Sequence, residues 1–154
     1  MLNKPSNFVP KGRVKDFSGT LSQPESAGLR FIVIPVSDEK KNTSGGSVFK
    51  RWPVCESAYN SWYRESYGNM PKWLGKIKTT QVQSDTVIVK ALCMNADVID
   101  YKALEKCIDA LGTEAANNSG TVHMCKFGDW DKVSEMIDSL LLKRGLNVNI
   151  YEKF

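Results

Sequence analysis

One stretch decides the fold expected of this chain: Leu29-Arg-Phe-Ile-Val-Ile-Pro-Val-Ser37. It is compact, apolar and rich in β-branched residues, and runs of this kind are typical of a strand buried inside a sheet. Polar residues follow over 38–47 and end in Ser44-Gly-Gly-Ser47, which indicates a loop closed by a tight turn. Residues 48–67 then have the pattern of a helix broken near Pro53, because proline fits the first turn of a second helix.

The rest of the chain continues this alternation. We expect strands near 75–82, 86–94, 121–127 and 147–151, a helix over 100–117 capped by Asp100, and a last helix that starts at Asp129 and ends before Gly145. Alternating strands and helices predict an α/β domain with a mixed, mostly parallel central sheet. In such sheets ligands bind where strands end and loops lead into helices, which selects residues 37–47 and 127–130.

Length and composition are those of one folded domain. The chain has 154 residues, of which 42% are hydrophobic and 25% charged, and this argues against disorder and coiled coil. We expect a polar lead-in over 1–17 and a single domain over 18–154. No apolar run approaches the roughly 20 residues that span a bilayer, and residues 1–16 lack the apolar core of a signal peptide. We therefore expect a cytoplasmic protein without a membrane partner.

Cysteine and histidine usage gives no sign of a metal or cofactor. The four cysteines, Cys55, Cys93, Cys107 and Cys125, form no Cys-x-x-Cys pair, and His123 is the single histidine. We expect reduced core thiols, no metal site and no cofactor. A lone histidine within a strand is more typical of a packed or hydrogen-bonded side chain than of a catalyst.

The net charge of +4 is unevenly distributed. Residues 1–80 hold 13 Lys/Arg and 6 Asp/Glu, a net charge of +7, whereas residues 81–154 hold 8 and 11, a net charge of −3. A basic half suits an anionic small ligand or an acidic partner, although composition alone favours a solvated basic face. The Ser44–Ser47 turn lies in the basic half. Its two glycines would let the backbone approach a phosphate, and a simple turn is the alternative interpretation.

Aromatic residues are concentrated in one segment, and they are Trp52, Tyr59, Trp62, Tyr63, Tyr67 and Trp73. A small core beneath the helix break is the favoured interpretation. Together with Lys72, Lys76 and Lys78 these rings would also suit single-stranded nucleic acid. No known nucleic-acid-binding signature is present, so nucleic acid ranks third among the partners considered.

Several short motifs occur in the order found in one known family. They are Gly19-Thr-Leu-Ser-Gln-Pro24, Ser44-Gly-Gly-Ser-Val48, Met124-Cys-Lys-Phe-Gly128, Trp130-Asp-Lys-Val133 and Val148-Asn-Ile-Tyr151. On these motifs the chain resembles the macrodomains over about residues 18–152, and the small phage-encoded macrodomain-like proteins in particular. The resemblance implies a three-layer α/β/α fold.

The resemblance also implies a ligand and a set of site residues. It implies that the chain binds ADP-ribose or a related NAD-derived nucleotide, and it leaves a weak ADP-ribosyl hydrolase activity open. The phosphate would be contacted by Ser44, Gly45, Gly46 and Ser47, with Gly128 and Asp129 on the opposite side. Thr20 would take the place of the acidic residue that recognises adenine in the family. Asp129 is the candidate catalytic residue, and helix capping is its alternative role.

Three departures from the family pattern concern the site. The end of the central strand reads Cys93-Met-Asn95 where one hydrolase branch has a lysine, which bears on the activity. Thr20 replaces the acidic residue and the loop between Gly128 and Trp130 is short, and these two departures motivate a second hypothesis. The alternative is therefore a degenerate macrodomain that serves as a phage protein–protein interaction module, acting on a host factor in the host cytoplasm.

Overall fold

Strand β2 (Arg30–Ser37) lies inside a seven-stranded sheet in the computed structural model, which describes residues 10–40, 43–66 and 69–154. Its neighbours are β4 (Thr86–Asn95) and β6 (Thr121–Cys125), and it runs parallel to both. The side chains from Phe31 to Ile34 are buried because each face of the strand meets a helical layer. The continuous apolar run therefore predicted a central strand correctly.

The other strands extend the sheet in the order β1-β7-β6-β2-β4-β3. β1 (Val14–Thr20) and β7 (Val148–Lys153) continue the parallel part, whereas β3 (Ile77–Gln83) and the short β5 (Val98–Ile99) pair antiparallel with β4. The expectation of a mixed, mostly parallel sheet is confirmed.

Strand β1 is an element that the sequence pattern did not predict. It begins at Val14, within the segment 1–17 expected as a lead-in. As an edge strand it is partly exposed on both faces, so it carries no continuous apolar run. Its parallel pairing with β7 makes residues 14–17 part of the sheet.

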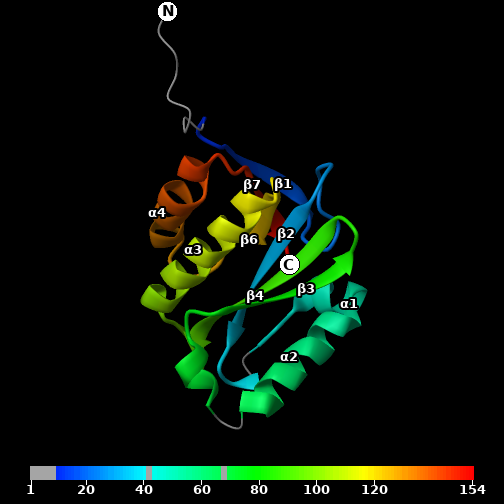
Figure 1. Cartoon of the computed structure of the whole chain (residues 1–154), viewed down its shortest axis with the longest axis vertical. Helices are drawn as coiled ribbons and strands as arrows, with labels where there is room; N and C mark the ends of the chain where they lie inside the picture. The colour runs from blue at the N-terminus through cyan, green and yellow to red at the C-terminus, as the bar shows by residue number, and fades with distance from the viewer. Residues whose placement is uncertain (1–9, 41–42, 67–68) are drawn as a thin grey trace, which may run out of the picture.

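The helices form one layer on each face of the sheet (Figure 1). One layer holds α3 (Tyr101–Asn117) and α4 (Trp130–Leu140), and the other holds α1 (Gly46–Arg51) and α2 (Pro53–Ser66). Two single turns, η2 (Met70–Trp73) and η3 (Leu142–Arg144), complete the chain. The three-layer α/β/α architecture is confirmed. Within the described residues no helix is long and apolar enough to cross a membrane.

Each face of the sheet has its own hydrophobic core. On the α3 and α4 side, α3 contributes the apolar stripe expected from its sequence: Leu104, Cys107, Ile108, Leu111 and Ala115. On the α1 and α2 side, Trp52, Tyr59 and Trp62 are buried beneath the helix break, while Tyr67 lies outside the described residues. The predicted cap is present, since the Asp100 carboxylate accepts a hydrogen bond from the Ala103 amide at 3.1 Å. All four cysteines are free thiols, and three of them are buried.

His123 is a buried, hydrogen-bonded side chain of β6. Its Nδ1 lies 2.9 Å from the Tyr151 hydroxyl oxygen and its Nε2 lies 2.7 Å from Thr121 Oγ1. The Tyr151 hydroxyl already accepts a hydrogen bond from the Glu25 amide, so its own proton is available to Nδ1, which places the ring proton on Nε2. Burial lowers the pKa of His123 to about 4, and the positive charge of Arg30 acts in the same direction.

We expect the His123 environment to make stability sensitive to acid. The neutral ring is required in the folded state, whereas the unfolded chain binds a proton below its ordinary pKa of about 6.5. The free energy of unfolding should therefore fall as pH decreases from 6.5 toward 4, and the His123 contribution should total about 3 kcal/mol. Urea unfolding of the wild type and of His123→Gln across this range measures it. A pH dependence that is identical in the two proteins contradicts the expectation.

Candidate functional site

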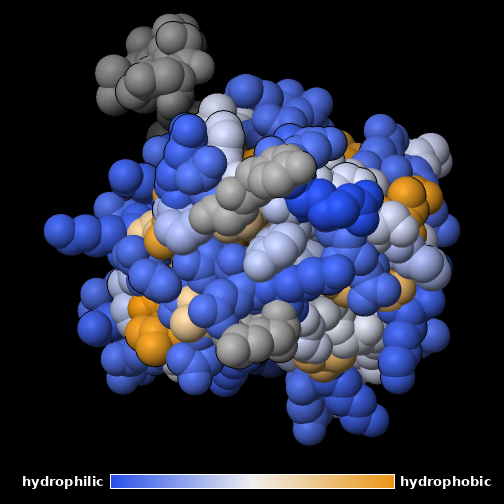
Figure 2. All heavy atoms as spheres, turned by 90° about the horizontal axis from the view of Figure 1, so that it is seen from below, coloured by the Kyte–Doolittle hydropathy of each residue, from blue (hydrophilic) through white to orange (hydrophobic). Residues whose placement is uncertain are grey.

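Two loops leave the sheet at the carboxyl ends of the adjacent parallel strands β2 and β6. One runs from Ser37 to α1 and the other from Cys125 to α4. Figure 2 views the molecule from below and shows a mostly hydrophilic face with small apolar patches. These are the two loops that the parallel-sheet rule selected from the sequence.

A polar network holds the first loop in place. The Thr43 hydroxyl oxygen accepts from the Ser37 amide at 2.9 Å and lies 2.9 Å from the Tyr59 hydroxyl, which donates to the Ser37 carbonyl. The buried Asp38 carboxylate accepts from the Ala96 amide at 2.7 Å, which ties the loop to the β4–β5 turn. Asp38 was not singled out from the sequence, although its place directly after a buried strand is the signal that could have indicated it.

The glycines of the first loop are covered by neighbouring aromatic rings. A Cβ added to Gly45 would lie 1.9 Å from the Phe49 ring, so the ring packs directly on this backbone. Gly46 has a φ of +51°, and an added Cβ would lie 2.9 Å from the Phe154 ring. The conformation and the close contact both require glycine at position 46.

The backbone of Phe154 occupies hydrogen-bond donors of the same loop. The Ser47 amide donates to the main-chain oxygen of Phe154 at 3.0 Å, and the Ser47 hydroxyl donates to the same atom. Thr20 lies beside this contact, because it pairs with Lys153 at the carboxyl end of β1. The structure therefore brings Thr20, Gly46 and Ser47 together around residues 153–154, whereas Ser44 is exposed.

The second loop packs against the start of α3. Gly128 has a φ of +64°, and an added Cβ would lie 2.6 Å from Ile99 and 3.0 Å from the Tyr101 hydroxyl. The Asp129 amide donates to that hydroxyl at 2.7 Å. The exposed Asp129 side chain accepts from the Lys132 amide at 3.5 Å and so caps α4. No hydrogen bond joins Gly128 or Asp129 to residues 44–47 in the described part of the chain.

A cavity of about 480 Å³ lies beside the ends of β1, β6 and β7. It is lined by Asp16, Phe17, Ser18, Cys125, Lys126, Ile150, Tyr151, Glu152 and Phe154. The residues predicted for the site are not among these. Phe154 links the two regions, since it lines the cavity and contacts Gly46 and Ser47. Phe154 was missed because no local pattern indicates that the end of β7 folds onto the start of α1.

Lys90 is a buried cation at a distance from these loops. It lies in β4, is 1% exposed, and donates from Nζ to Thr80 Oγ1 at 2.6 Å. Burial lowers its pKa to about 8. It faces α2 through Cys55 rather than the carboxyl ends of the strands, so it is not part of the candidate site.

The fold and the loops define a class: a three-layer α/β/α protein with candidate ligand loops at the carboxyl ends of adjacent parallel strands. Solved structures share this architecture along nearly their whole length. A macrodomain protein from Streptomyces coelicolor has a TM-score of 0.78 at 24% identity, covering 93% of this chain and 99% of that one. A protein of unknown function from Bacteroides thetaiotaomicron has a TM-score of 0.79 at 19% identity, with coverages of 90% and 96%.

The macrodomain of Mycobacterium tuberculosis DarG is also similar, with a TM-score of 0.63 at 17% identity, covering 93% of this chain and 99% of that one. No protein-family model and no curated protein matches the chain. The similarity therefore lies in the three-dimensional structure, and the chain has the macrodomain fold.

We expect Gly46→Ala to lower the free energy of unfolding by about 1–2 kcal/mol, because alanine at this positive φ is strained and its Cβ meets Phe154. Gly19→Ala is the matched control, since no atom lies within 4 Å of its added Cβ. Urea denaturation of both variants measures the difference. Equal effects at the two positions would contradict both the strained backbone at position 46 and its contact with Phe154.

Proposed function

We propose that the protein binds ADP-ribose or a related NAD-derived nucleotide at the loops that follow β2 and β6. Macrodomains generally bind ADP-ribose, and the fold of this chain is theirs. The observation that carries the proposal is the convergence of two Ser47 donors, the amide and the hydroxyl, on one oxygen atom. A phosphate oxygen is the anionic acceptor that such donors would hold, in the place that the main-chain oxygen of Phe154 occupies.

The cavity beside Phe154 supports a ligand of nucleotide size. Its volume of about 480 Å³ falls within the range of small-molecule sites. Phe17 and Phe154 offer apolar surface for a base, while Lys126 adds positive charge at its rim. Binding would require Phe154 to move away from Ser47, so the Phe154 contact would compete with the ligand.

Isothermal titration with ADP-ribose tests the proposal. We expect saturable heat for the wild type. Ser47→Ala should weaken binding about tenfold, because a hydrogen bond to a charged group is lost. Gly46→Glu should abolish it, because the side chain blocks the loop and repels phosphate.

Lys102→Gln is the control for Gly46→Glu, because both substitutions lower the net charge by one and Lys102 is exposed on α3, which covers the opposite face of the sheet. It should bind as the wild type does. The absence of heat and of a thermal shift at millimolar ADP-ribose would contradict the proposal.

We further propose Asp129 as the residue on which a weak ADP-ribosyl hydrolase activity would depend. Its exposed carboxylate lies at the start of α4, where it could serve as a general base for water. Asp129→Asn separates this role from capping, because asparagine caps helices as well as aspartate does.

We expect Asp129→Asn to leave the melting temperature and ADP-ribose binding unchanged while reducing release of ADP-ribose from a modified peptide at least a hundredfold. Chromatography of released ADP-ribose measures this. Unchanged release in the variant would exclude a chemical role for Asp129.

One observation favours the alternative of a protein-interaction module. The Ser47 donors are already satisfied inside the chain, so the loop does not need a ligand to complete its hydrogen bonds. Purification of the tagged protein from expressing cells, followed by mass spectrometry, discriminates between the two. A stoichiometric partner together with no nucleotide binding would favour this alternative.

A further inference from the structure

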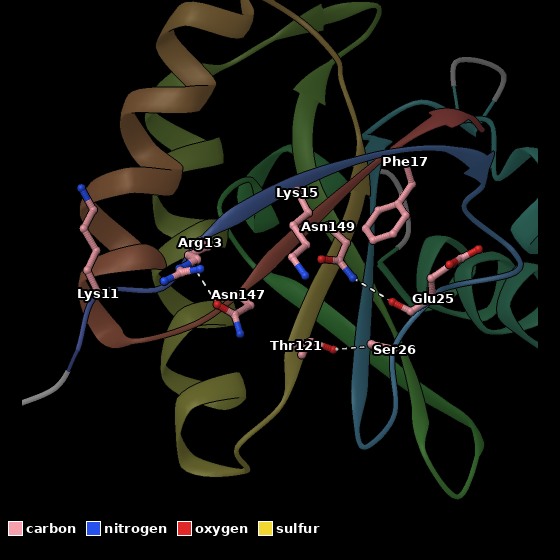
Figure 3. Close-up of a pocket in the computed structure, with 9 residues that line it drawn as sticks. All are labelled: Lys11, Arg13, Lys15, Phe17, Glu25, Ser26, Thr121, Asn147 and Asn149. Carbon is pink, nitrogen blue, oxygen red and sulfur yellow. Dashed lines mark hydrogen bonds between the residues drawn. The ribbon is translucent and has the colours of Figure 1, made fainter.

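A groove crosses the half of the sheet that α1 and α2 do not cover. On the side of the sheet that carries α1 and α2, the segment 21–29 packs on β7 and β6 (Figure 3). A cavity of about 660 Å³ lies between this segment and β1. It extends from the amino ends of these strands, whereas the candidate ADP-ribose site lies at their carboxyl ends. Its lining is polar and basic although it lies on a sheet face.

Cations follow β1 along this groove. Arg13, Lys15 and Phe17 alternate along the chain, so their side chains share one face at intervals of about 7 Å. Lys11 is paired with Asp138 at 2.6 Å, and it extends along α4 in Figure 3. In the described part of the chain the Arg13 and Lys15 side chains have no hydrogen bond and no ion pair. Their charges are therefore available to an anion.

A buried amide supplies fixed polar groups beside these cations. Asn149 is 6% exposed, and its Nδ2 donates to the Glu25 carbonyl oxygen at 2.9 Å. This bond orients the side chain, and its amide oxygen points to the side of the groove on which Lys15 lies (Figure 3). The Glu25 carboxylate points away from Lys15 in the same view, so the acidic member of the lining does not neutralise the cations.

The aromatic ring of Phe17 follows Arg13 and Lys15 along this face of β1. Phe17 stacks on Tyr151 with ring centroids 5.4 Å apart and an interplanar angle of 16°. Tyr151 is in turn held by the Glu25 amide and His123, so the platform beneath Phe17 is rigid. Phe17 also lines the groove, which leaves part of its surface accessible to a planar group.

We propose that this groove is a second binding site, for a nucleoside phosphate that is either free or part of a single strand. Arg13 and Lys15 hold phosphate, Phe17 stacks with the base, and the Asn149 oxygen accepts a hydrogen bond from the base or the ribose. The lysines that the sequence associated with nucleic acid, Lys72 to Lys78, lie elsewhere, at η2 and β3. Phe17 lines both cavities, so the two proposed sites share this ring. They differ in the residues that hold phosphate, which are Ser47 in the ADP-ribose site and Arg13 and Lys15 in the groove.

Titration of 5′-AMP and of a labelled six-nucleotide DNA strand at low salt tests the proposal. Isothermal titration measures the binding of both probes, and fluorescence anisotropy also measures the binding of the labelled DNA. We expect Lys15→Glu to weaken binding of the better ligand at least tenfold, and Phe17→Leu to weaken it about tenfold while leaving inorganic pyrophosphate binding unchanged. Lys102→Glu, with the same change in net charge, should bind as the wild type does.

The two proposed sites can be separated by Gly46→Glu. It should abolish ADP-ribose binding and leave binding in the groove intact. Lys15→Glu should weaken binding in the groove and leave ADP-ribose binding intact. If 5′-AMP binds and the DNA strand does not, the ligand is a free nucleotide. If the strand binds more tightly than 5′-AMP and its affinity falls steeply with salt, the ligand is single-stranded nucleic acid. Three results would overturn the proposal. Binding of the probes is lost in Gly46→Glu but not in Lys15→Glu, Lys102→Glu loses as much binding as Lys15→Glu, or neither probe binds the wild type.

Discussion

The parallel pairing of β2 with β6 is the constraint on which the rest of the structure depends. Because both strands run the same way, the loops that follow them leave the sheet at one edge and reach their helices from there. The pairing is stabilised by burial on both faces, since the side chains of β2 alternate between two separate hydrophobic cores. A ligand site at this edge is a consequence of strand direction rather than of any single residue.

Polar interactions then give the edge its particular shape. Asp38 and Thr43 hold the first loop against the β4–β5 turn and α2, and Tyr101 holds the second loop against α3. Each loop is thus anchored to a different helical layer. Phe154 lies at the first loop, where its main-chain oxygen accepts from both donors of Ser47. The shape of the site at rest is therefore set by the chain itself, and a ligand has to compete with an internal contact.

The unequal covering of the two sheet faces explains where further polar groups gather. α3 and α4 pack over β6 and β7, so Val148 and Ile150 are buried among apolar neighbours. On the opposite face the same strand presents Asn149 to the groove, together with Asn147 directly before it, while Tyr151 is buried beneath the Phe17 ring. Because side chains alternate along a strand, one element supplies both a hydrophobic core and a polar surface.

Local patterns in the sequence determined the central strands, the helices, their caps and the carboxyl-end loops. Burial, helical periodicity and capping act over a few residues, so the sequence by itself was enough to predict the buried position of Leu104 and the capping role of Asp100. Contacts between distant segments were decided only by the tertiary structure. Three features depend on which strands become neighbours: the exposed edge strand β1, the contact of Phe154 with Ser47, and the pairing of Lys15 with Asn149. No short stretch of sequence encodes that choice.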